Sequence, residues 1–99
     1  MRSKPRHRTK RDDNEQEIVN ALESIGCTVH RLDTPVDLLV GYRHFNFLIE
    51  CKNPDTDYGR KDRSTPTQRQ FFTDWRGQVR KVSGPEEAIQ LVTHAYKTR

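Results

Sequence analysis

Apolar residues recur along the chain with two different periods, one typical of helices and the other of strands. In residues 13–25, Ile18, Leu22 and Ile25 recur at intervals of four and three residues, which places them on one face of a helix. Gly26 follows at a position where glycine commonly ends a helix. We therefore expect an amphipathic first helix with one buried side.

The alternation that marks strands begins directly after this helix. Residues 27–32 alternate apolar and polar side chains, and residues 37–52 form two apolar runs around a polar centre at 43–44. This pattern predicts a strand followed by a hairpin. Antiparallel pairing about the polar centre would place Asp37 opposite Glu50.

The rest of the chain predicts a loop, two more helices and one more strand. Residues 53–65 carry few apolar side chains and several turn formers, which indicates an exposed loop. A helix is expected to begin at Pro66, a strand to span 78–82 and a last helix to follow around Pro85. The predicted order is αβββαβα, an α/β fold with a mixed sheet flanked by helices. Three aromatic residues of the second helix are expected to face the core: Phe71, Phe72 and Trp75.

Charge is distributed unevenly along the chain. The formal net charge is +4, but residues 1–11 hold six Lys or Arg and no acidic residue, which leaves 12 basic and 14 acidic residues elsewhere. We expect residues 1–12 to form a flexible basic arm and residues 13–99 a single folded domain. The arm is either a solvated terminus or a contact for a nucleic-acid backbone.

Cysteine and histidine positions argue against a zinc site or a secreted, disulfide-bonded domain. Cys27 and Cys51 lie in apolar runs without metal-ligand spacing, so both are expected to be buried free thiols in the reducing cytoplasm. No apolar stretch approaches the roughly 18 residues of a membrane span. The four histidines share no spacing and are expected to have core or surface roles: His7, His30, His44 and His94.

The hairpin carries the residues with the most specific chemistry. Glu50 and Lys52 must share one face of their strand, while Ile49 and Cys51 point to the other. A carboxylate pair formed by Asp37 and Glu50 would need a hard cation such as Mg²⁺ or Mn²⁺ between its members. Lys52 beside that ion would suit phosphodiester hydrolysis. The alternative is a surface strand with ordinary ion pairs of little energetic value.

Six segments follow one another along residues 13–95: N-E-x-E-I-V, D-L-L-V-G-Y, E-x-K, T-P-x-Q, W-R-G-Q-V and a closing helix of small apolar residues. In this order they resemble the PD-(D/E)xK nucleases, in particular the virus-type replication-repair (VRR-NUC) branch, and the resemblance covers nearly all of this range. One departure is that Pro35 lies two residues before Asp37, where the family usually has proline directly before the aspartate.

The resemblance implies a restriction-endonuclease-like core and assigns roles within the hairpin. Asp37, Glu50 and the backbone carbonyl of Cys51 would bind Mg²⁺ or Mn²⁺. Lys52 would serve the attacking water. The side chain of Cys51 is expected to turn into the core, so that only its carbonyl is available.

The family pattern also implies an acidic residue from the first helix and a glutamine from the second. Glu15 and Glu17 are the two candidates for the first role. On a helical wheel, Glu15 lies roughly 60° from Ile18 and Glu17 roughly 100° from it, which favours Glu15. Gln68 matches the family glutamine and is expected to point toward the site in a positioning role. The alternative for Gln68 is a surface amide near the helix cap.

The resemblance implies an endonuclease that hydrolyses DNA phosphodiester bonds. Selectivity for branched DNA such as four-way (Holliday) junctions, cutting by a homodimer, and the cytoplasm of a bacterial or phage-infected cell are expected. Alternatives are a flap- or sequence-directed nuclease and a non-catalytic DNA-binding or assembly module with the same fold. Six basic residues are candidate DNA contacts: Arg60, Lys61, Arg63, Arg76, Arg80 and Lys81.

Overall fold

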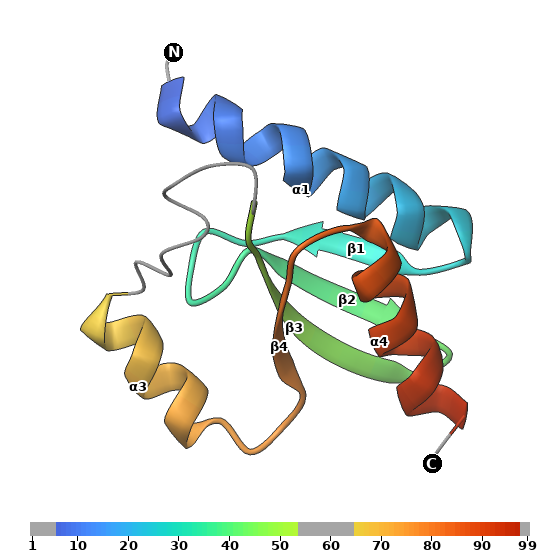
Figure 1. Cartoon of the computed structure of the whole chain (residues 1–99). Coiled ribbons are helices and arrows are strands. Elements are labelled where there is room, and N and C mark those ends of the chain that lie inside the picture. The colour runs from blue at the N-terminus through green and yellow to red at the C-terminus, as the bar shows by residue number, and fades with distance from the viewer. Residues whose placement is uncertain (1–5, 54–64, 98–99) are drawn as a thin grey trace.

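A mixed four-stranded sheet with helices beside it forms the structure, a computed structural model that describes residues 6–53 and 65–97 (Figure 1). The strand order is β1-β2-β3-β4, and all neighbours are antiparallel except β3 and β4, which are parallel. The predicted α/β fold with a mixed sheet flanked by helices is confirmed. The described elements are α1 (Arg6–Ser24), β1 (Thr28–Arg31), β2 (Leu38–Tyr42), β3 (Phe45–Cys51), α3 (Pro66–Asp74), β4 (Val79–Val82) and α4 (Pro85–Lys97).

The β2–β3 hairpin has the register that the sequence predicts. Leu38 pairs with Ile49, and the Asp37 N–H donates to the Ile49 carbonyl at 3.1 Å. Arg43 and His44 form the turn with φ angles of 51° and 75°. Two consecutive residues with positive φ are typical of the two-residue turns that match the twist of a hairpin.

The hydrophobic core lies between one face of the sheet and the helices α1 and α4. Phe47 and Ile49 alternate along β3 with residues of the opposite face, and both are buried against these two helices. Burial of such side chains supplies most of the stability of a domain of this size. The core residues contributed by the helices include Ile18, Leu22, Ala88 and Val92.

The first helix differs from the prediction at its N-terminal end. α1 begins at Arg6, well before the predicted start at residue 13, so the arm expected at residues 1–12 overlaps its first turns. Residues 6–12 contain no proline or glycine, and nothing in their sequence interrupts a helix. The opposite end agrees better, because α1 ends at Ser24 and Gly26, two residues later, has a φ of 99°.

α3 does not contribute to the core, which contradicts the prediction for its aromatic residues. None of the residues of α3 is buried. Phe71 and Phe72 are half-buried, and Trp75 is 47% exposed. Figure 1 shows α3 lying away from α1 and α4. The spacing of apolar residues tells which side chains share a helix face, but not whether that face meets the sheet.

Both cysteines are free, and only one is buried. Cys27 is a core residue, and its burial raises the pKa of its thiol to about 11, so this thiol is protonated at neutral pH. Cys51 is half-buried, contrary to the prediction. Within residues 6–53 and 65–97, no helix combines the length and the hydropathy that crossing a bilayer requires.

Candidate active site

Three potential metal ligands from distant parts of the sequence meet where β2 begins and β3 ends. Glu15 comes from α1, Asp37 directly precedes β2, and Cys51 is the last residue of β3. One ligand atom from each lies within 4.8 Å of the other two. Glu15 is only 5% exposed and Asp37 only 3%. We call these three residues the acidic cluster.

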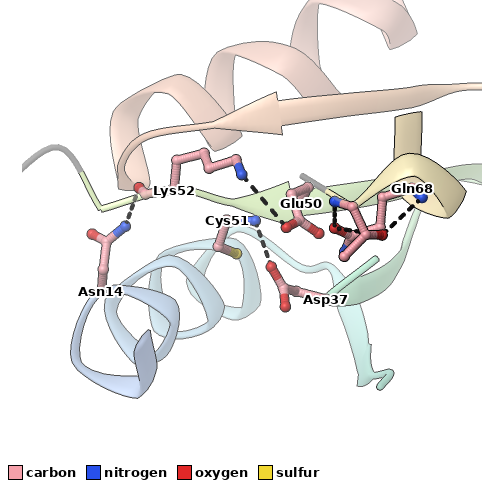
Figure 2. A network of polar contacts seen from close by, with 7 residues as sticks. Asn14, Asp37, Glu50, Cys51, Lys52 and Gln68 are labelled. Atoms are coloured by element: carbon pink, nitrogen blue, oxygen red, sulfur yellow. Dashed lines mark hydrogen bonds and ion pairs between the residues drawn. The ribbon is translucent and has the colours of Figure 1, made fainter. Parts of the chain in front are cut away.

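Hydrogen bonds to the backbone fix the position of Asp37 in the cluster. Its Oδ2 accepts from the Cys51 N–H at 2.8 Å, as Figure 2 shows. Its own N–H donates to the Ile49 carbonyl at 3.1 Å. The Asp37 backbone therefore extends the hydrogen bonding of the hairpin, and its carboxylate is bonded to the backbone of the last residue of β3.

Glu15, and not Glu17, is the acidic residue that α1 contributes. Glu17 is exposed, whereas the Glu15 carboxylate forms an ion pair with Arg31 at 3.1 Å. Arg31 also donates to Gln16 Oε1 at 2.7 Å. The Arg31 side chain is 41% exposed and the Glu15 side chain only 6%. Arg31 thus partly offsets the negative charge of the cluster from its solvent side.

Glu50 and Lys52 lie on the other face of β3. They alternate with the core residue Ile49 and with Cys51, as the strand pattern predicts. The Lys52 Nζ is 3.8 Å from Glu50 Oε2, and the two side chains are 16% and 13% exposed. In Figure 2 the Lys52 side chain and the Cys51 sulfur extend to opposite sides of β3.

This arrangement corrects one prediction. Cys51 was expected to offer only its carbonyl, but its sulfur lies near the two carboxylates. The hairpin register is the one expected to place Asp37 opposite Glu50, although among the described residues Glu50 is not a member of the acidic cluster. Asp37 lies just outside β2, and its carboxylate accepts from the Cys51 N–H.

Asn14 is a positioning residue that the sequence reasoning missed. Its Nδ2 donates to the Lys52 carbonyl at 2.7 Å and to the Ser83 carbonyl at 3.4 Å. The Lys52 N–H in turn donates to the Val82 carbonyl at 2.8 Å. Asn14 directly precedes Glu15, and its place in the N-E-x-E segment was a signal that could have identified it.

We expect Asn14→Ala to destabilise the fold by about 1 kcal/mol, because the substitution removes hydrogen bonds between α1 and the ends of two strands. Urea unfolding would measure this loss. Asn20→Ala is the matched control, since Asn20 is exposed on the same helix and accepts only a local bond from Gln16. Equal effects of the two substitutions would contradict the positioning role of Asn14.

Gln68 has a defined role in the cap of α3. Its Oε1 accepts from the Thr65 N–H at 3.0 Å, and its own N–H donates to Thr65 Oγ1 at 3.1 Å. This reciprocal pair is a capping box. It corresponds to the capping alternative for Gln68, and in this structure its carboxamide oxygen is held by the helix cap.

The candidate DNA contacts are only partly described. Arg76 and Arg80 are exposed. Lys81 is half-buried, and its Nζ lies 5.1 Å from the centroid of the Phe72 ring. The remaining three, Arg60, Lys61 and Arg63, lie outside the described residues.

The donor atoms of the acidic cluster fit a divalent cation. Two ligands on opposite sides of Mg²⁺ are about 4 Å apart, and the ligand atoms of Glu15, Asp37 and Cys51 lie within 4.8 Å of one another. Small side-chain rotations would bring them to bonding distance. The carboxylates are hard donors and the thiol a softer one, a combination better suited to Mn²⁺ than to Mg²⁺. Comparison with protein families, curated proteins and solved structures finds no match to this chain.

Proposed function

We propose that this protein is a divalent-metal-dependent DNA endonuclease with a PD-(D/E)xK core. The observation that carries the proposal is the acidic cluster: two carboxylates, each at least nine-tenths buried, meet within 4.8 Å at the end of the hairpin. Burying two acids side by side is unfavourable unless positive charge lies near them. Arg31 supplies one such charge, and a metal ion would supply the rest.

The residues around the cluster suit the hydrolysis of a phosphodiester bond. Glu15 and Asp37 would hold Mg²⁺ or Mn²⁺, and Glu50, which the hairpin register places opposite Asp37, would be a further ligand. The ion would polarise a phosphoryl oxygen and activate water. Lys52 lies just beyond the end of β3, where its side chain, now beside Glu50, would have to turn around the strand end toward the ion. Its ammonium group would then donate to the attacking water or to the phosphoryl oxygens as charge develops. The Asn14 bond to its carbonyl would hold the Lys52 backbone in place.

The proposed substrate is DNA with a branched structure, such as a four-way junction, cut by a homodimer. Its phosphates would contact the four basic residues of the segment from Thr65 to Val82, which are Arg69, Arg76, Arg80 and Lys81. Two symmetric copies would match two strands of a junction, since a two-fold assembly presents the same surface twice.

A cleavage assay tests this proposal. Labelled four-way junction, flap and linear duplex DNA would be incubated with Mn²⁺ and the wild type, Glu50→Ala or Lys52→Ala. We expect wild-type cleavage of branched DNA and a loss of about 100-fold or more for Lys52→Ala, the scale for removing one electrostatic stabiliser. Cleavage that survives both substitutions at the wild-type rate would contradict the proposed roles.

A non-catalytic DNA-binding module is a second candidate, and one observation favours it. Glu15 already has Arg31 as a partner, and Glu50 lies beside Lys52 on the other face of β3. Ion pairs can therefore account for these acids without a metal. DNA binding by the wild type without cleavage of any substrate, in either Mn²⁺ or Mg²⁺, would favour this candidate.

A further inference from the structure

The three aromatic residues at the end of α3 form a cluster on the surface, which we call the aromatic platform. It consists of Phe71, Phe72 and Trp75. None of them is buried, and Trp75 is 47% exposed. Large aromatic side chains usually contribute to stability by burying most of their surface. Phe71 and Phe72 are half-buried and Trp75 is exposed, so packing within the described residues uses only part of the surface of these rings.

The platform has a fixed geometry. The Phe71 and Trp75 rings stack with centroids 5.2 Å apart and an interplanar angle of 26°. The Phe72 ring meets Phe71 edge-on at 6.2 Å. Gly77 leaves room for the indole, since a Cβ there would lie 2.7 Å from Trp75 Nε1. One face of the indole is covered by Phe71, and the large exposed fraction of Trp75 leaves the other available to a ligand.

The segment that carries the platform has more basic than acidic residues. Residues 65–82 contain a single acidic residue, Asp74, which accepts hydrogen bonds from Gln70. Arg76 directly follows Trp75 and is exposed, and Lys81 Nζ lies over the Phe72 ring. The same segment contains four basic residues: Arg69, Arg76, Arg80 and Lys81.

We propose that the aromatic platform binds unpaired nucleotides of DNA, with a base stacked on Trp75 and the adjacent phosphates near Arg76. Aromatic rings combined with basic side chains are the features with which proteins bind single-stranded nucleic acid. A base inside a duplex has no free face, so only unpaired nucleotides fit the platform. The choice of DNA as the nucleic acid rests on the proposed nuclease function. Within branched DNA, the platform favours substrates with an unpaired segment, such as a flap, over a fully paired four-way junction.

Charge disfavours a second copy of the chain as the partner of this surface. Two copies that met through their platforms would bring together two segments, each with four basic residues and one acidic residue. Like charges at an interface oppose association. Phosphates offset this charge and release counterions on binding.

Trp75 is the only tryptophan of the chain, so its fluorescence reports directly on the platform. We would titrate the full chain in EDTA with an oligo-dT strand and with a blunt duplex of equal length. We expect saturable quenching by the single strand and a much weaker response to the duplex. Anisotropy of labelled oligo-dT should show binding about 10-fold weaker for Trp75→Leu, which keeps apolar bulk without an aromatic face, and a smaller loss for Trp75→Phe.

Leu39→Ala is the matched control, because Leu39 is another exposed large apolar residue, on β2, and it should bind like the wild type. Unchanged binding by Trp75→Leu would overturn the proposal. The proposal would also be overturned if Trp75 fluorescence changed with protein concentration alone and sedimentation showed a dimer. Those two results would indicate that a second copy of the chain covers the platform. Binding in EDTA needs no catalysis, so the two proposals can fail separately. If the wild type cleaves DNA but Trp75→Leu binds oligo-dT as well as the wild type, only the platform proposal is wrong. If binding depends on Trp75 but no DNA is cleaved, only the nuclease proposal is wrong.

Discussion

Asp37→Asn is expected to lower the DNA cleavage rate on the order of 10³-fold while leaving the fold intact. Asparagine has nearly the same shape, and its side-chain oxygen can still accept from the Cys51 N–H. Only the negative charge is removed. The rate loss would be measured in single-turnover assays with Mn²⁺, with Asp33→Asn as a control at an exposed aspartate of the preceding loop.

Thermal unfolding of Asp37→Asn, with and without Mn²⁺, tests whether Asp37 binds the metal ion. In EDTA, Asp37→Asn should not lower the melting temperature, because it relieves repulsion between two buried acids that lie within 4.8 Å. Adding Mn²⁺ should stabilise the wild type by about 2.7 kcal/mol at a hundredfold excess over Kd, and the variant far less. Equal stabilisation of both proteins by Mn²⁺ would show that the ion binds elsewhere.

Phe47→Ala should have the largest effect on stability, with a loss of about 3–5 kcal/mol in the free energy of unfolding. Phe47 is 1% exposed and is the largest of the fully buried side chains. Its removal leaves a cavity under β3, the strand that carries the candidate site. Urea unfolding would measure the loss, which is a large part of the total for a domain of this size.

Leu39→Ala serves as the control for this experiment as well. Leu39 lies on β2 next in sequence to the buried Leu38, but its side chain is 39% exposed. Its replacement should cost only about 1 kcal/mol. A loss for Phe47→Ala as small as that for Leu39→Ala would contradict the position of the core between the sheet and α1 with α4.

The parts of the fold that sequence alone predicted are those determined by local patterns. The hairpin register follows from alternation on both sides of a two-residue turn, because a slip by one residue would expose Leu38 and Ile49. The same alternation predicted that Glu50 and Lys52 would lie on the face of β3 opposite to Ile49. The preference for Glu15 over Glu17 followed from helical periodicity in the same way.

The predictions from sequence that were wrong concern contacts between elements that are distant along the chain. The apolar spacing of α3 gave no information about whether the helix would reach the sheet, and its aromatic residues remained at the surface. Strand alternation predicted that Cys51 would offer only its carbonyl, but its sulfur lies near the carboxylates of Glu15 and Asp37. Neither result follows from residue spacing, because each depends on where a second element lies.

The parallel pairing of β3 with β4 has a consequence for the order in which the site is assembled during synthesis. The hairpin joins residues close in sequence and can form early, but Lys52 N–H finds its acceptor only on Val82, in β4. Closing the longer connection requires residues up to Val82 to have left the ribosome. A nascent chain would therefore hold the two carboxylates of the cluster before its lysine is anchored, and the proposed DNA cleavage would begin only after β4 has paired with β3.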